Sequence, residues 1–321
     1  MSFRTANLAC LLCCVGLIGC QSGQQADSDL LDIVPRKWSP LQGYVQTYTY
    51  KNVGWRELKL HVYEPREKSK GATDEARPVM LLVHGGGWVA GNPSTFKSYA
   101  EYFASRGAVA VTMDYRLCIE PGVTLADCVA DTQDAIRWIR TNWRELRVDP
   151  NRIAVIGESA GGHLAACTAL LRRPISLVDE LKMSSRPNAV LLLNPVLDLT
   201  SNQLIKALPG VRGSELGIDD PKHPLHRLSP ITYVRPGLPP MWIAHGTSDD
   251  IVPFEQAPRF TTMMEQSGNR CELVVMEGKG HSFGIPWMSS EQTVVQVMDA
   301  MDEFLVSIDY LDDKPSLAVI D

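Results

Sequence analysis

Short apolar runs alternate with amphipathic segments along most of the chain. The segments Tyr44 to Tyr50 and Glu57 to Tyr63 alternate apolar and polar residues on either side of Asn52-Val53-Gly54, which predicts a β-hairpin at the edge of a sheet. The runs that follow are apolar almost throughout, as strands covered on both faces must be. They are Val79 to Val83, Ala108 to Met113, Ile153 to Ile156, Ala189 to Leu193, Met241 to Ala244 and Leu273 to Met276.

Helices are predicted between these strands. Apolar residues recur at spacings of three and four from Thr124 to Leu146, which predicts one long amphipathic helix. A second helix is expected near Ser94 to Ser105, followed by Gly107. A last helix is expected after Ser289, which forms a capping-box pattern with Gln292. Alternating strands and helices predict an α/β fold with a mostly parallel central sheet and helices on both faces, in which functional groups gather beyond the carboxyl ends of the strands.

The N-terminal segment has a different pattern. Arg4 precedes an apolar run from Leu8 to Ile18, and the segment closes with Leu17-Ile18-Gly19-Cys20, which resembles a bacterial lipoprotein signal. We therefore expect a signal peptide over 1–19 and a flexible tether over 20–40 that carries a lipid on Cys20. An ordinary secretory signal is the alternative. Either predicts export, and the lipid would anchor the protein at a membrane, on its periplasmic or outer-membrane face.

Composition and charge restrict the partners. The 321 residues are 45% hydrophobic, which allows a large core, and they carry a net charge of -6 without a basic cluster interleaved with aromatic residues. Nucleic acid is therefore not an expected partner. Of the cysteines beyond Cys20, only Cys118 and Cys128 are close in sequence, and a disulfide and two buried thiols both remain open. The sequence has no HExxH motif, and no metal site is predicted.

The first chemical motif follows the apolar run Ile153 to Ile156. Gly157 to Gly161 reads G-x-S-x-G between a predicted strand and a predicted helix, where a sharp turn projects a nucleophilic serine. Glycine is needed at both ends of the motif because side chains there would clash with neighbouring elements. Ser159 is the predicted nucleophile. Glu158, next to it, is expected to point away.

A second motif, His84 to Trp88, reads HGGGW directly after a predicted strand. Three consecutive glycines let backbone N–H groups approach a ligand oxygen, as an oxyanion hole requires. We predict that the N–H groups of Gly86 and Gly87, together with that of Ala160, form this hole. Trp88 is a candidate wall of the substrate pocket, with core packing as the alternative.

The third group of residues supplies a base and an acid. His281 lies in the glycine-rich loop Gly278 to Gly284, and Asp249 follows another strand. A nucleophilic serine needs a histidine to take its proton, and the imidazole needs a carboxylate to hold its tautomer. The order Ser159, Asp249, His281 along the chain is that of the α/β-hydrolases. The other histidines of these motifs, His84, His163 and His245, are expected to be structural.

These motifs together carry a family resemblance. HGGGW, DYRL, GESAGGHLA, HGTSD and GKGHSFG resemble the α/β-hydrolase superfamily, within it the hormone-sensitive-lipase-like carboxylesterases, and most closely their acetyl-xylan and feruloyl esterase-like branch. The resemblance covers Val79 to Val306. In that family the acid is the third residue after the glycine of the HGTSD turn, which is Asp249 here, with Asp250 as the alternative.

The resemblance also implies the domain organisation. We expect an α/β-hydrolase catalytic domain over 41–310 and a C-terminal tail over 311–321. The connection 198–240 lies between two core strands and is long for a plain loop, so we expect it to form a small cap. The sequence of this segment does not follow the family pattern, so the resemblance says little about the substrate.

The function predicted is that of a serine carboxylesterase acting on short-chain esters through an acyl-enzyme, with no cofactor. Export favours acetylated polysaccharides or oligosaccharides as the ester substrate. Two alternatives remain. The same triad could cleave an amide or peptide, as in formamidases, or the fold could serve as a non-catalytic surface binding module.

Overall fold

The computed structural model describes four parts of the chain, residues 45–65, 76–175, 183–200 and 224–312. The predicted signal peptide (1–19), the lipidation at Cys20 and the tether (20–40) lie outside them, as do most of the predicted cap (198–240) and tail (311–321). Within the described parts, no helix combines the length and apolar character needed to span a membrane.

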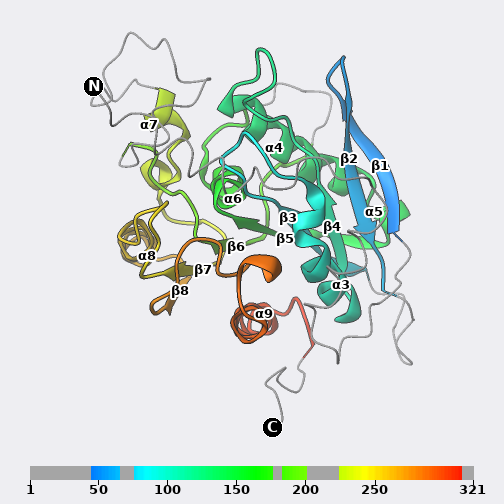
Figure 1. Cartoon of the computed structure of the whole chain (residues 1–321). Coiled ribbons are helices and arrows are strands. Elements are labelled where there is room, and N and C mark those ends of the chain that lie inside the picture. The colour runs from blue at the N-terminus through cyan, green and yellow to red at the C-terminus, as the bar shows by residue number, and fades with distance from the viewer. Residues whose placement is uncertain (1–44, 66–75, 176–182, 201–223, 313–321) are drawn as a thin grey trace, which may run out of the picture.

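One mixed sheet organises the molecule (Figure 1), and its strand order is β1-β2-β4-β3-β5-β6-β7-β8. The first two strands form the predicted hairpin and are antiparallel to their neighbours, while the other neighbouring pairs are parallel. The strands are β1 (Val45–Asn52), β2 (Glu57–Tyr63), β3 (Arg77–Val83), β4 (Val109–Met113), β5 (Val148–Glu158), β6 (Ala189–Leu193), β7 (Met241–Gly246) and β8 (Cys271–Met276). The predicted mostly parallel α/β sheet is confirmed.

Helices cover both faces of this sheet. The helices α4, α6 and α8 contribute to one buried cluster, and α3 and α9 contribute to the other. The α-helices are α3 (Lys97–Ser105), α4 (Leu125–Thr141), α5 (Trp143–Leu146), α6 (Ala160–Leu170), α7 (Pro224–Leu228), α8 (Gln256–Gln266) and α9 (Glu291–Val306). Short 3-10 turns are η2 (Pro93–Phe96), η5 (Pro230–Tyr233) and η6 (Pro286–Met288).

The predicted long helix is divided in the structure. It begins as expected, because Thr124 caps α4 through a capping box. The helix α4 ends at Thr141, and α5 begins at Trp143. Between them, Asn142 donates both a backbone and a side-chain N–H to the carbonyl oxygen of Trp138. This side chain competes for the helix carbonyl and marks the break, which apolar spacing alone does not reveal.

The other two predicted helices also differ at their starts. The segment near Ser94 to Ser105 opens with the 3-10 turn η2 before α3 begins at Lys97. The capping box predicted from Ser289 and Gln292 is wrong by one residue. Ser290 caps α9, and its side chain accepts a hydrogen bond from the backbone N–H of Thr293.

The central strands bury both faces. Val79, Leu81 and Val83 of β3 belong to one cluster, and Met80 and Leu82 belong to the other. This alternation explains why the strand sequences are apolar throughout. Each such side chain contributes about 1.5–3 kcal/mol when it is fully buried.

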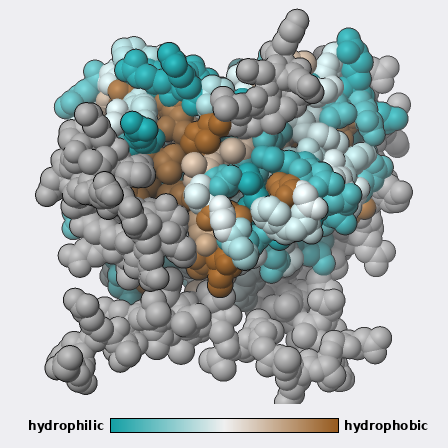
Figure 2. All heavy atoms as spheres, turned by 90° about the horizontal axis from the view of Figure 1, so that it is seen from above, coloured by the Kyte–Doolittle hydropathy of each residue, from teal (hydrophilic) through white to brown (hydrophobic). Residues whose placement is uncertain are grey.

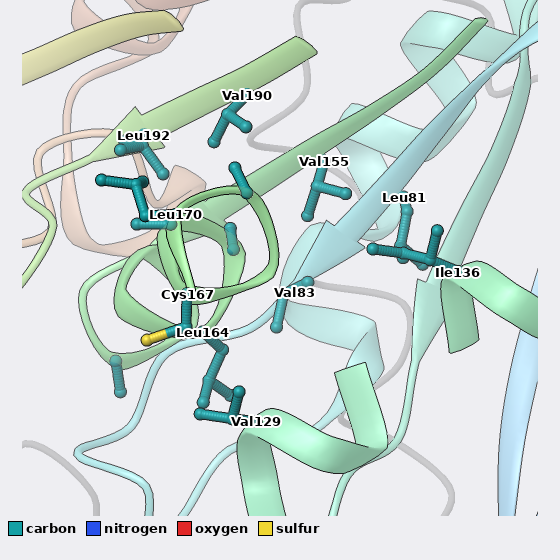
Figure 3. Close-up of a cluster of buried hydrophobic side chains, with 14 of the residues drawn as sticks. Leu81, Val83, Val129, Ile136, Val155, Leu164, Cys167, Leu170, Val190 and Leu192 are labelled. Carbon is teal, nitrogen blue, oxygen red and sulfur yellow. The ribbon is translucent and has the colours of Figure 1, made fainter. Parts of the chain in front are cut away.

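Figure 3 shows how one of these clusters is filled. Side chains from neighbouring strands face side chains from α4 and α6, and those labelled are Leu81, Val83, Val129, Ile136, Val155, Leu164, Cys167, Leu170, Val190 and Leu192. All of these are buried. In Figure 2, apolar residues gather near the centre of the face, and hydrophilic residues lie above them and to their right.

The parallel strands bring the predicted functional loops together. The strands β3, β5, β7 and β8 run in the same direction, so their carboxyl ends lie at one edge of the sheet. The HGGGW loop follows β3, Ser159 follows β5, Asp249 follows β7 and His281 follows β8. The candidate site therefore lies at this edge, as is general for such sheets.

Candidate active site

Ser159 occupies a sharp turn between β5 and α6. Its backbone has φ 54° and ψ −118°, a sparsely populated conformation. A Cβ atom on Gly157 would lie 2.3 Å from the carbonyl oxygen of Gly161, and one on Gly161 would lie 2.0 Å from that of Val83. Both glycines are therefore required by close packing. The turn is held to β6 by the hydrogen bond from the Ser159 N–H to the carbonyl oxygen of Leu193, 2.8 Å long.

The structure brings Ser159, His281 and Asp249 into one hydrogen-bonded series. The Ser159 hydroxyl lies 2.8 Å from Nε2 of His281. On the other side of the ring, Nδ1 of His281 lies 2.8 Å from Oδ2 of Asp249. Asp250, the alternative acid, has no such contact with His281 and is exposed. This is the geometry of a serine nucleophile, a general base and a carboxylate that orients the base.

The Asp249 carboxylate is held by four donors. Oδ1 accepts the backbone N–H groups of Ile251 at 2.9 Å and Val252 at 2.8 Å. Oδ2 lies 3.1 Å from Nε2 of His245 in addition to its contact with His281. Burial alone would raise the pKa of Asp249, but the hydrogen bonds from His245 and His281 outweigh it and hold that pKa well below the ordinary value. Asp249 is therefore an ionised carboxylate near neutral pH.

Two loops bind each other and so hold the acid beside the base. The Ser248 N–H donates to the carbonyl oxygen of Lys279, 2.9 Å away. The Gly278 N–H donates to Oγ1 of Thr247, 2.8 Å away. Burial lowers the pKa of the His281 imidazole, but the hydrogen bond to Asp249 and nearby acidic charges outweigh it, so this pKa is raised.

The glycine-rich loop after β3 packs directly against the nucleophile turn. Gly86 has φ 111° and Gly87 has φ 61°, conformations that favour glycine. A Cβ on Gly161 would lie 2.5 Å from the carbonyl oxygen of His84, so the turn and the loop are in contact. The Ala160 N–H is at the first position of α6, where helix N–H groups have no intrahelical acceptor. The structure thus places the three predicted oxyanion donors on two adjoining segments.

Trp88 occupies a core position. Its side chain is 4% exposed and belongs to a hydrophobic cluster. The indole meets the His163 ring edge-on, with 5.3 Å between centroids. The structure therefore agrees with the packing alternative rather than with an open pocket wall.

The histidines expected to be structural are buried and hydrogen-bonded. His84 Nδ1 lies 2.8 Å from the carbonyl oxygen of Gly85, and His163 Nε2 lies 2.8 Å from that of Leu228. Burial lowers the pKa of both His84 and His163 to about 4, so both are neutral near neutral pH. The third, His245, contacts Asp249 and so supports the acid.

The prediction that Glu158 points away from the site is wrong. Its Oε1 lies 3.8 Å from Nε2 of His281 and accepts a hydrogen bond of 2.9 Å from the Ser282 hydroxyl. Ser282 has φ 61°, and this left-handed conformation belongs to the loop that carries His281. No sequence signal identifies this contact, because it depends on how two loops that are distant in sequence pack together.

Cys118 and Cys128 are buried free thiols in the structure. Their sulfur atoms lie 3.7 Å apart. The Cys118 N–H donates to the carbonyl oxygen of Trp88, 2.7 Å away, so this loop is bound to the glycine-rich loop. Among the described residues, no group of His, Cys, Asp and Glu is placed to hold a metal ion.

Comparison with known proteins assigns the family. The BD-FAE family model matches residues 60–264. Esterase 2 of Thermogutta terrifontis, in a structure phosphoramylated by tabun, is 39% identical with a TM-score of 0.75, and the match covers 84% of this chain and 97% of that chain. Its propionate-bound structure is 38% identical with a TM-score of 0.74, over 86% and 98% of the two chains.

Relatives known from sequence include esterases of two kinds. Esterase LipC of Mycobacterium tuberculosis is 29% identical over 78% of this chain and 64% of that protein. The isoprenylcysteine alpha-carbonyl methylesterase ICME of Arabidopsis thaliana is 29% identical over 70% of this chain and 53% of that protein, so the chain spans about half of such plant relatives. The predicted resemblance to acetyl-xylan and feruloyl esterase-like α/β-hydrolases is confirmed. The chain belongs to the BD-FAE family of α/β-hydrolase esterases.

Proposed function

We propose that this protein is a serine carboxylesterase that hydrolyses short-chain esters through an acyl-enzyme. The observation that carries the proposal is the series Ser159, His281, Asp249, with 2.8 Å at both junctions. The relatives support the same chemistry. Thermogutta esterase 2 has been seen with propionate and butyrate bound, and phosphorylated by paraoxon.

Acylation begins at Ser159. Nε2 of His281 takes the hydroxyl proton as Oγ attacks the ester carbonyl, and the ionised Asp249 stabilises the imidazolium that forms. The N–H groups of Gly86, Gly87 and Ala160 are the proposed donors to the developing oxyanion. Each such donor is worth about 2.7–4 kcal/mol in sites of this kind.

Departure of the alcohol completes acylation, and deacylation then uses the same groups with water as the nucleophile. His281 gives its proton to the leaving alcohol oxygen, and the alcohol departs. The neutral imidazole then takes a proton from water as that water attacks the acyl-enzyme, and Ser159 recovers its proton when the tetrahedral intermediate collapses to the acid. This chemistry needs no cofactor.

The proposal also covers the natural substrate and the cellular location of the protein. The N-terminal signal pattern supports an exported protein that is anchored by a lipid on Cys20. Export and membership of the BD-FAE family support acetylated polysaccharides or oligosaccharides as the natural esters.

Lipidation at Cys20 can be tested by labelling. Radiolabelled palmitate should enter the full-length protein in a bacterial host and be absent from Cys20→Ala. Equal labelling of both proteins would contradict lipidation at this residue.

The decisive experiment measures hydrolysis of p-nitrophenyl acetate by the parent and by Ser159→Ala. We expect turnover by the parent and none above background by the variant. Paraoxon should inactivate the parent and add one diethylphosphoryl group to the peptide that contains Ser159, as seen by mass spectrometry. A folded parent that leaves esters intact but cleaves formamides would favour the amidase alternative. A parent inert to both substrates and to paraoxon would favour a binding module.

A further inference from the structure

The Glu158 carboxyl group lies between the nucleophile turn and the loop that carries the base. Oε1 is 3.8 Å from Nε2 of His281, on the side of the ring that faces Ser159. At this distance the contact is electrostatic, because a hydrogen bond would be shorter. The proposed ester hydrolysis leaves this second carboxylate without a role, since Asp249 already binds the opposite nitrogen.

The surrounding residues hold the Glu158 side chain in one place. The residue is 4% exposed, and Oε1 accepts the Ser282 hydroxyl at 2.9 Å. Oε2 lies so close to Gly85 that a Cβ on Gly85 would be 1.9 Å from it. The first glycine of the HGGGW loop therefore makes room for this carboxylate. Ser282, whose hydroxyl donates to the Glu158 carboxylate, has a left-handed backbone with φ 61°.

We propose that Glu158 is a positioning residue that acts through His281, its carboxylate stabilising the imidazolium form that develops when Ser159 gives up its proton. The proposal rests on the proposed esterase function. A negative charge about 4 Å from Nε2 complements the one that Asp249 supplies at Nδ1, and an opposite charge at such a distance favours the charged form of a histidine.

Four other titratable groups of the described residues act on this pair or lie in its field, namely Asp249, Asp250, Tyr99 and Tyr115. Asp249 and Asp250 also act on the His281 imidazole, and all three acidic groups raise its pKa. Tyr99 and Tyr115 lie in the field of Glu158, and burial raises the pKa of both phenols, so both are neutral. The positive charge that acts on the Glu158 carboxylate is therefore that of the His281 imidazolium.

The charges of Glu158 and His281 act on each other's pKa. Burial raises the pKa of Glu158, while the charge of His281 and the hydrogen bond from Ser282 counter that rise. Removal of the Glu158 charge should lower the pKa of His281. The acid limb of the pH profile should then move to lower pH, and the plateau of kcat/KM should fall because the imidazolium is less stable in the transition state.

The test compares Glu158→Gln with the parent, because glutamine keeps the size of the side chain and one acceptor for Ser282. We expect the midpoint of the acid limb of kcat/KM for p-nitrophenyl acetate to fall by about 1 unit and the plateau to fall about tenfold. Glu277→Gln is the matched control. Glu277 is exposed, so this variant makes the same change in net charge and should keep the parental midpoint.

Two further variants separate charge from packing. Glu158→Asp keeps the charge, so its midpoint should lie closer to that of the parent than the midpoint of Glu158→Gln does. Ser282→Gly is compatible with the left-handed backbone and removes the hydroxymethyl side chain that donates to Glu158. Its midpoint should lie between those of the parent and Glu158→Gln, because the Glu158 carboxyl loses a donor and is ionised less completely.

The pKa of the His281 imidazole, measured by NMR, provides a readout that does not need activity. A parental imidazole pKa in Glu158→Gln, with activity lost equally at every pH, would overturn the proposal and leave Glu158 a packing residue. A lowered imidazole pKa in a protein that hydrolyses no ester would support the electrostatic coupling while the proposed function failed. If the parent is an active esterase but Glu158→Gln shifts neither the pH midpoint nor the imidazole pKa, the inference about Glu158 is refuted and the proposed function stands.

Discussion

Replacement of Asp249 by asparagine is informative because the structure dictates which way the new amide must face. Oδ1 of Asp249 accepts the backbone N–H groups of Ile251 and Val252, at 2.9 and 2.8 Å. Only the amide oxygen can accept these two donors, so it must take the position of Oδ1. The amide NH2 group is then left facing Nδ1 of His281, where Oδ2 lies 2.8 Å away in the parent.

This orientation reverses the hydrogen bond to the base. An NH2 group needs an acceptor, so His281 should lose the proton on Nδ1 and carry it on Nε2 instead. In that tautomer Nε2 cannot accept the proton of Ser159. A change of this kind lowers the rate about 10⁴-fold in a serine protease, which corresponds to about 5 kcal/mol of transition-state stabilisation at 1.36 kcal/mol per tenfold. We expect a loss of this order in kcat/KM.

The assay is hydrolysis of p-nitrophenyl acetate by Asp249→Asn, with circular dichroism to check that the protein is folded. Asp250→Asn is the matched control, since Asp250 is the neighbouring acid and is exposed. Its kcat/KM should stay within about threefold of the parent, as expected of a surface charge far more weakly coupled to the base. The reasoning is refuted if folded Asp249→Asn keeps a tenth of parental activity, or if Asp250→Asn loses as much.

Three other perturbations test the fold and the titration of the base. Gly161→Ala would place a Cβ 2.0 Å from the carbonyl oxygen of Val83, so we expect a lowered melting temperature and little activity, and a parental melting temperature would contradict the packing. Asp302→Asn removes the charge of a buried carboxylate that binds the partly exposed Arg106 at 2.8 Å. It should lower the free energy of urea-induced unfolding by up to about 3 kcal/mol, and a loss under about 1 kcal/mol would show that the pair contributes little to stability. Because the pKa of His281 is raised above 6.5 and only its neutral form accepts a proton, kcat/KM should fall as the pH drops through a midpoint above 6.5. A midpoint below 6.5 in the pH profile would argue against this assignment.

Most of the architecture could be predicted because its signals are local. The strands β3 and β7, and the last part of β5, are buried on both faces, so their apolar runs are visible in the sequence. The residues that follow them, such as Ser159 after β5, are marked by glycines that the tight turn requires. Helix ends were less accurate. The break at Asn142 and the cap at Ser290 depend on individual side-chain hydrogen bonds, which hydrophobic spacing does not reveal.

The sequence by itself determined the parallel sheet, the family resemblance, the nucleophile Ser159 and the base His281, because these follow from periodicity and from short motifs in order along the chain. Only the tertiary structure decided that Asp249 rather than Asp250 contacts the base, and that Glu158 faces His281. The physical reason is that both contacts join loops that are distant in sequence. The direction of a side chain there is set by what packs against it, and for Glu158 that is Gly85.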